Sequence, residues 1–144
     1  MRQNVPVAEI MTKELITLTL SNSLYDAEKL FKKHNIRHIP IVNEGKLIGV
    51  LSYSDLLKIS YADVLDDEDD LMDVSSVVYD VYSISQVMAK VVVSALPTAT
   101  IKEVTEILAK QSFHSIPIVD EENNLLGIVT TTDLLKYFLK QYQN

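Results

Sequence analysis

Two stretches of the chain place a glycine, two hydroxyl side chains and a carboxylate at the same spacing. Residues 49–55 read GVLSYSD and residues 127–133 read GIVTTTD. An ionised carboxylate only accepts hydrogen bonds, so it pairs well with the two hydroxyl donors of a ribose diol. Hydroxyl groups and backbone amides at the start of a helix are suited to bind a phosphate. Each stretch therefore has the chemistry needed to hold a phosphorylated ribose.

The same residues also suit a purely structural role. The pairs Ser54-Asp55 and Thr132-Asp133 are typical of a helix start, where one capping side chain stabilises by about 1 kcal/mol. A cap needs only one such residue, whereas both stretches have a further hydroxyl and a glycine upstream. Each glycine lets either a ligand or another strand approach closely. The structural and the ligand-binding interpretations both stay open at this point.

The chain contains an internal repeat. A shift of 77 positions aligns the Ile-Pro-Ile-Val run at 39–42 with the same run at 116–119. After one extra residue in the turn that follows, a shift of 78 positions aligns Asp55 with Asp133. Insertions in polar hairpin loops cost little, so the difference is compatible with a tandem repeat. We expect a first repeat over residues 1–60, an acidic linker over 61–83 and a second repeat over 84–144.

Both repeats predict the same order of elements, β-α-β-β-α behind a short helical turn. The acidic residue three positions after Ser23 and after Thr100 predicts a capping box at the start of each first helix. In the first repeat we expect a turn at 7–11, a strand at 15–18, a helix from Ser23 to about His34, hairpin strands at 37–42 and 46–52, and a helix at 54–60. In the second repeat we expect a strand at 91–93, a helix from Thr100, hairpin strands at 114–119 and 125–130, and a helix at 132–142.

Composition excludes several classes of partner. The net charge of −7 argues against a partner held through a nucleic-acid phosphate backbone. No apolar run approaches the roughly 18 residues of a membrane span, and the N-terminus lacks a signal peptide, so we expect a cytoplasmic protein. The acidic run at 66–70 lacks the spaced ligands and central glycine of a calcium loop, and we interpret it as a solvated linker. A helix that continues through residues 71–78 is compatible with this linker.

The sequence disfavours an enzyme. It contains no cysteine nucleophile, no cluster of His and acidic residues with metal-ligand spacing, and no Walker-type phosphate loop. Asp55 and Asp133 lie at equivalent places in two repeats, so we interpret them as duplicated binding groups and not as an acid/base pair.

The Ile-Pro-Ile-Val run followed by Gly-x-x-(Ser/Thr)-x-(Ser/Thr)-Asp resembles the cystathionine-β-synthase (CBS) domain, and two copies in tandem resemble a Bateman module. The resemblance covers about residues 7–60 and 84–142. It implies an α/β (α+β) fold in which two β-α-β-β-α repeats pack about a pseudo-twofold axis. It also implies two clefts between the repeats that take adenosine-containing ligands, among them AMP, ADP, ATP and S-adenosylmethionine.

The resemblance assigns roles to individual residues. The two aspartates would accept hydrogen bonds from ribose, the neighbouring hydroxyls would bind ribose or phosphate, and the first strand of each repeat would contact adenine. Arg37 and His38 would reach phosphate in the first site, where the second offers His114 and Ser115, so the sites are unequal and the first suits phosphate better. A solvated or cross-strand role is an equal alternative for these polar residues. The ligand-binding residues that we expect are Ile16, Thr17, Arg37, His38, Ile39, Pro40, Gly49, Ser52, Ser54, Asp55, Val93, Ser94, His114, Ile116, Pro117, Gly127, Thr130, Thr132 and Asp133.

Three functions follow as hypotheses. The first is a stand-alone regulatory module that binds AMP, ADP or ATP and signals to a separate protein partner. The alternatives are a sensor of S-adenosylmethionine and a ligand-free dimerisation scaffold. We expect no resident cofactor, and the few basic residues favour a ligand with few phosphates unless Mg²⁺ assists. A homodimer is expected because one apolar face of the last helix of each repeat must cover its own sheet, and the remaining apolar surface is left to contact a second module. The apolar residues of these helices are Leu56, Leu57, Ile59, Leu134, Leu135, Phe138 and Leu139.

Overall fold

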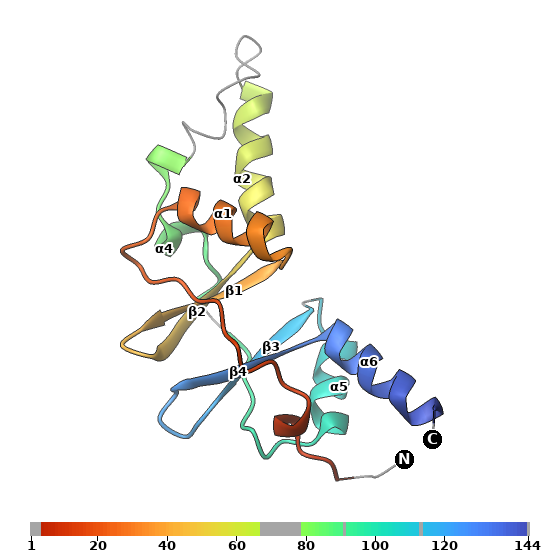
Figure 1. The fold of residues 1–144 in the computed structure, drawn as a ribbon. Coiled ribbons are helices and arrows are strands. Elements are labelled where there is room, and N and C mark those ends of the chain that lie inside the picture. The colour runs from red at the N-terminus through yellow and green to blue at the C-terminus, as the bar shows by residue number, and fades with distance from the viewer. Residues whose placement is uncertain (1–3, 67–78, 91, 113, 144) are drawn as a thin grey trace. The chain divides into compact units, whose positions relative to one another are not determined.

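The computed structural model describes residues 4–66, 79–90, 92–112 and 114–143. Helices and two small antiparallel hairpins alternate along the chain, which confirms the expected α+β fold (Figure 1). The elements are η1 (Val7–Glu9), α1 (Leu24–His34), β1 (His38–Asn43), β2 (Lys46–Ser52), α2 (Tyr53–Asp66), α4 (Ile84–Val87), α5 (Ile101–Lys110), β3 (Ser115–Val119), β4 (Leu125–Thr130) and α6 (Thr131–Tyr142).

Helices α1 and α5 begin at the predicted capping boxes. The Asp26 amide donates to Ser23 Oγ at 3.2 Å, and the Ser23 amide donates to Asp26 Oδ2 at 2.9 Å. Thr100 and Glu103 form the same reciprocal pair, with both distances at 3.1 Å. These bonds satisfy amides that the first helical turn leaves unpaired, so both predicted helix starts are confirmed.

Both predicted hairpins form. Glu44 and Gly45 connect β1 to β2, and both have positive φ, at 51° and 82°. A two-residue loop of this kind matches the right-handed twist of the strands that it joins. In the second hairpin Ile116 pairs with Val129, and the register shifts near the turn between Ile118 and Val119.

The leading strands predicted at 15–18 and 91–93 are wrong as far as the structure describes those residues. Leu18 makes a single parallel bridge to Ile41, and Ala95 makes the equivalent bridge to Ile118. The Leu18 amide donates to the Pro40 carbonyl at 3.1 Å, but Pro40 has no N–H to continue the ladder toward residue 16. Pro117 limits the second ladder in the same way, because it can accept from the Ala95 amide but cannot donate.

The linker region differs from its prediction at one end. Helix α2 continues to Asp66, well beyond the expected end at residue 60. Most of the acidic run, and the helix that we considered through residues 71–78, lie outside the described residues. The described residues resume at Tyr79, and Ser83 and Gln86 form a further capping box at the start of α4.

The described chain forms two compact units. Unit 1 comprises residues 1–15, 45–47 and 93–144, and unit 2 comprises residues 16–44 and 48–92. The units therefore do not follow the repeat boundaries. Unit 1 combines most of the second repeat with the first residues of the first repeat, and unit 2 combines most of the first repeat with the first residues of the second repeat. The tip of the first hairpin belongs to unit 1 because the Leu47 amide donates to the Asn123 carbonyl at 3.1 Å.

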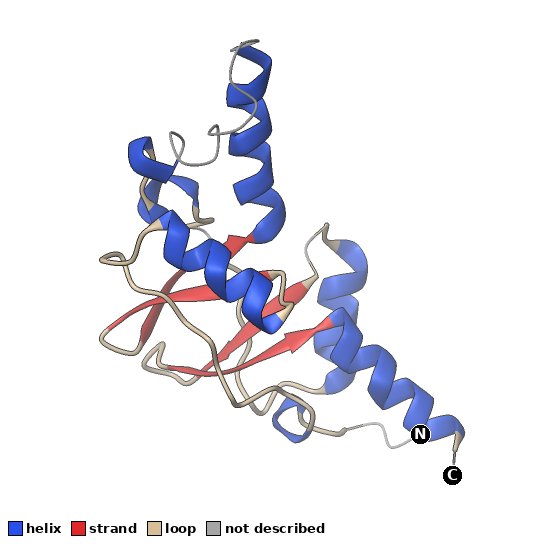
Figure 2. Ribbon diagram, turned by 45° about the horizontal axis from the view of Figure 1, so that its top comes forward, coloured by secondary structure: helices blue, strands red, loops and turns tan. Residues whose placement is uncertain are grey.

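Each unit has its own hydrophobic core, built from equivalent positions of the two repeats. Helices α1 and α2 contact each other beside the first hairpin, and α5 and α6 do so beside the second (Figure 2). No described helix is long and apolar enough to cross a membrane. The fully buried side chains include Leu24, Ile39, Ile41, Leu51, Leu56 and Ile84 in unit 2, and Val7, Val104, Ile116, Ile118 and Val129 in unit 1.

Candidate functional site

The first candidate site lies in unit 2, where β2 passes directly into α2. Strand β2 ends at Ser52, and α2 begins with the next residue, so Asp55 occupies the first helical turn. The Asp55 amide donates to Ser52 Oγ at 3.0 Å, and the Ser52 and Ser54 hydroxyl oxygens lie 3.2 Å apart. The capping hydroxyl is therefore Ser52 and not Ser54, because the helix starts one residue earlier than predicted.

The Asp55 carboxylate keeps its acceptor capacity. Its side chain is 38% exposed, and the nearest cation is Lys58, whose Nζ lies 3.9 Å from Oδ1. Among the described residues, no hydrogen-bond donor reaches the two carboxylate oxygens. Both oxygens remain able to accept hydrogen bonds from a ligand, with a helix N-terminus and two hydroxyls beside them.

Backbone contacts join one segment of unit 2 to this motif and a second segment to the neighbouring strand β1. The Tyr53 amide donates to the Arg37 carbonyl at 2.8 Å, which places exposed Arg37 beside the start of α2. The bridge from Leu18 to Ile41 brings the exposed Thr17 and half-buried Ile16 alongside β1. The structure thus gathers the first-repeat residues of the predicted site within one unit.

The second candidate site lies in unit 1 at the junction of β4 and α6. Thr130 and Asp133 form a reciprocal capping box, with the Asp133 amide 3.1 Å from Thr130 Oγ1 and the Thr130 amide 3.0 Å from Asp133 Oδ2. The cap is again one hydroxyl earlier than predicted, at Thr130 and not at Thr132. The Thr131 amide donates to the His114 carbonyl at 2.9 Å, the counterpart of the Arg37 contact.

The glycines of both motifs face other segments of the chain. A Cβ on Gly49 would lie 2.9 Å from the Ala89 carbonyl oxygen, and one on Gly127 would lie 3.0 Å from the Thr12 carbonyl oxygen. Of the two partners that the sequence allowed, a ligand or another strand, the structure shows the second. Thr12 was missed as a neighbour of this motif, although its predecessor Met11 aligns with Met88 in the repeat.

The remaining predicted residues differ in how far they are exposed to solvent. Ile39 and Ile116 are fully buried in the two cores, so neither residue presents an accessible surface to a ligand, contrary to the prediction. His114, Val93 and Ser94 are exposed. No group of three or more acidic residues or histidines among the described residues is arranged to hold a metal ion.

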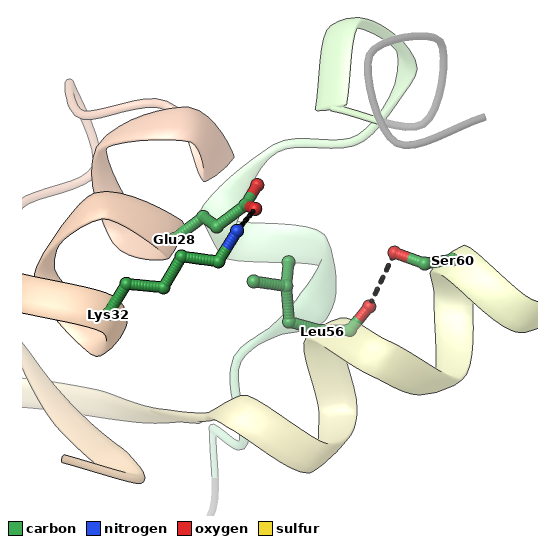
Figure 3. A network of polar contacts seen from close by, with 4 residues as sticks. All are labelled: Glu28, Lys32, Leu56 and Ser60. Carbon is green, nitrogen blue, oxygen red and sulfur yellow. Dashed lines mark hydrogen bonds and ion pairs between the residues drawn. The ribbon is translucent and has the colours of Figure 1, made fainter. Parts of the chain in front are cut away.

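A second polar cluster, on α1 of unit 2, has a structural role. Figure 3 shows Glu28 paired with Lys32, and Ser60 donating to the Leu56 carbonyl one turn back in α2. Burial raises the pKa of the Tyr79 hydroxyl, and its hydrogen bond to Glu28 raises it further. Burial also acts to raise the pKa of Glu28, but the hydrogen bonds from Lys32 and Tyr79 outweigh it and leave the pKa lowered. The cluster thus joins Tyr79 to α1.

The two repeats match a known family over most of the chain. The profile of the CBS domain matches residues 7–62 and 84–140. The chain belongs to the CBS domain family. The two matches in one chain make it a tandem CBS pair, or Bateman module, as the sequence motifs predicted.

Similar proteins extend this assignment. The chain is 30% identical to the CBS domain-containing protein YhcV of Bacillus subtilis, over 89% of this chain and 81% of that protein. It is 33% identical to protein MJ0188 of Methanocaldococcus jannaschii over 92% of this chain, but over only 44% of that protein. The chain thus spans less than half the length of MJ0188.

A solved structure resembles nearly the whole chain. It is the CBS domain pair of protein MJ0100 in complex with 5′-methylthioadenosine and S-adenosyl-L-methionine. The two share 28% sequence identity and a TM-score of 0.76, over 96% of this chain and 99% of that one.

Proposed function

We propose that this CBS pair is a regulatory module that binds an adenosine-containing small molecule. The observation that carries the proposal is the Asp55 carboxylate, which keeps its acceptor capacity beside Ser52, Ser54 and the start of α2. A ribose diol supplies the donors that this carboxylate lacks, and charge-assisted hydrogen bonds of this kind are strong. The complex of the MJ0100 pair with two adenosine derivatives supports the same ligand class.

The surrounding residues suit the rest of such a ligand. We assign the ribose to Asp55 and Asp133, the adenine to the Ile16–Thr17 and Val93–Ser94 segments, and phosphate to the helix starts. The Arg37 carbonyl accepts from the Tyr53 amide at the start of α2, and we assign the guanidinium of this exposed residue to phosphate in the first site. We propose ligand contacts for the other predicted site residues that the two cores leave accessible, but not for Gly49 and Gly127, which face other segments of the chain.

Two types of adenosine ligand suit these sites. A nucleotide with few phosphates, such as AMP, fits the small number of cations at the first site, whereas ATP would call for Mg²⁺ to offset its charge. S-adenosylmethionine and methylthioadenosine are the second candidates, because they carry no phosphate and are the ligands of the MJ0100 pair. With either ligand, a separate protein partner would recognise the ligand-bound form of the module.

Thermal unfolding with a ligand panel tests the proposal. A ligand at about 100 times its dissociation constant stabilises the folded state by about 2.7 kcal/mol, which is a clear shift in Tm for a chain of this size. We expect a shift with AMP or S-adenosylmethionine and none with GMP. Asp55→Asn should remove most of the shift without lowering the Tm of the free protein. No shift with any adenosine derivative would contradict the proposal and favour the ligand-free scaffold.

We also propose that the module acts as a homodimer. Helix α6 exposes Leu135, Leu139 and Tyr142, with 58%, 62% and 86% of their surfaces accessible. Their spacing of four and three residues places them on one face of the helix. An isologous contact would bury this stripe against the same stripe of a second copy.

A further inference from the structure

We propose that Thr12 makes the Asp133 position the weaker of the two adenosine sites, so that ligand occupies the Asp55 position first. The inference rests on the proposed function and adds a residue that sets the order of occupancy. Thr12 lies outside both motifs and outside the residues that we assigned to ligand binding.

Thr12 and Ala89 occupy equivalent places in the two units. Thr12 exchanges two backbone hydrogen bonds with Ile128, at 2.9 and 3.0 Å. Ala89 exchanges two with Val50, at 2.9 and 3.1 Å. Ile128 and Val50 each directly follow the glycine of their motif, so the two backbones meet in the same register.

The side chains at these equivalent places differ in one respect that matters for the aspartates. Thr12 Oγ1 lies 3.5 Å from Asp133 Oδ2, the same oxygen that accepts the Thr130 amide at 3.0 Å. Ala89 has no hydroxyl to offer to Asp55. Within the described part of the chain, the Asp55 carboxylate instead has one charged neighbour, the exposed Lys58 ammonium, 3.9 Å away.

A ribose diol therefore meets two different carboxylates. At Asp55 both oxygens accept new hydrogen bonds without losing existing ones. At Asp133 the diol competes with Thr12 and with the Thr130 amide for Oδ2, and displacing the amide also costs part of the helix cap. Oδ1 remains available at Asp133, so the second site is weakened and not abolished.

Calorimetric titration of the full chain with AMP and with S-adenosylmethionine tests this order. We expect one tight site and one site weaker by about tenfold or more, the effect of losing one hydrogen bond to a charged group. Asp55→Asn should remove the tight phase. Thr12→Val keeps the branched shape but removes the hydroxyl, and it should tighten the weak phase. Thr12→Ser keeps the hydroxyl and should leave both phases unchanged.

Ala89→Thr provides the reciprocal change. It should introduce a competing hydroxyl beside Asp55 and weaken the tight phase, while the Asp133 phase stays the same. Two equal sites in the wild type, or an unchanged affinity ratio in both Thr12→Val and Ala89→Thr, would overturn the inference and leave the proposed function intact. The absence of binding by either ligand to the wild type would overturn the proposed function together with the inference.

Discussion

Asp55 and Asp133 show how far residue type and spacing predict a site. Both lie in the first turn of a helix, as their motifs indicated, but the capping hydroxyls are Ser52 and Thr130 and not the predicted hydroxyls two positions later. Their carboxylates nevertheless differ, because Thr12 reaches Asp133 from 121 positions away in the chain. Local sequence predicts a helix start at each aspartate, but it contains no signal for a partner that only the tertiary fold brings into contact.

Asp120 should make the stability of the protein depend on pH in the acid range. Hydrogen bonds from the Asn124 side chain and backbone lower the pKa of the Asp120 carboxyl, and the Glu122 amide adds to this. A lowered folded-state pKa stabilises the protein above the unfolded value near 3.9, and this stability is lost as the pH falls through the folded-state pKa. Asp120→Asn should therefore flatten the acid limb of stability.

Urea unfolding between roughly pH 3 and pH 7 measures this effect. Glu121→Gln is the matched control, since it removes a carboxylate of the same turn that accepts no hydrogen bond among the described residues. An acid limb equally steep in Asp120→Asn and in the wild type would show that the Asp120 contacts do not stabilise the turn.

At the scale of elements, local signals predicted the helix starts and both hairpins. The capping boxes and the alternation of apolar strand residues act within a few positions, so the sequence displays them directly. The leading strands failed because Pro40 and Pro117 lack the N–H that a longer ladder needs. That outcome depended on which strand the leading segment pairs with, and the sequence does not specify the pairing.

A side chain at Gly49 should destabilise the contact between β2 and the segment at residues 88–89. A Cβ at residue 49 would lie 2.9 Å from the Ala89 carbonyl oxygen, so the paired segments must shift to accommodate it. We expect Gly49→Ala to lower the free energy of unfolding by about 1–3 kcal/mol, as overpacking does elsewhere. Chemical denaturation measures the loss.

Gly45→Asn is the control for Gly49→Ala. Gly45 has φ of +82° and no atom within 4 Å of its would-be Cβ, and asparagine tolerates this backbone region. Gly45→Asn should change stability little. Equal stability of Gly49→Ala and the wild type would mean that the glycine is not required for the approach of residues 88–89.

At the scale of the whole molecule, the repeat was visible in the sequence, and the composition of the compact units was not. Residues up to 15 join unit 1, and residues 84–92 join unit 2, so each hairpin is completed by the leading segment of the other repeat. Periodicity identifies equivalent residues, but equivalent leading segments fit either hairpin. The alignment of Met11 with Met88 showed that the two leading segments are equivalent, but it did not show that each one packs in the unit of the other repeat.

The exposed apolar face of α6, formed by Leu135, Leu139 and Tyr142, predicts a dimer in solution. Light scattering after size exclusion should give twice the chain mass of 16.2 kDa for the wild type. Leu135→Lys combined with Leu139→Lys should give the monomer, because both side chains are more than half exposed and their replacement places charge in the contact. Lys136→Gln, which changes a neighbouring exposed residue, should leave the dimer intact. A monomeric wild type would contradict the proposal.

The Asp55 carboxylate should bind the ribose of an adenosine ligand. A crystal structure of the chain grown with the ligand that raises Tm most tests it directly. We predict density for the ligand with its ribose hydroxyl oxygens within about 3 Å of the Asp55 carboxylate, beside Ser52 and Ser54. Ligand density elsewhere, with the Asp55 oxygens contacted by no ligand hydroxyl, would contradict it.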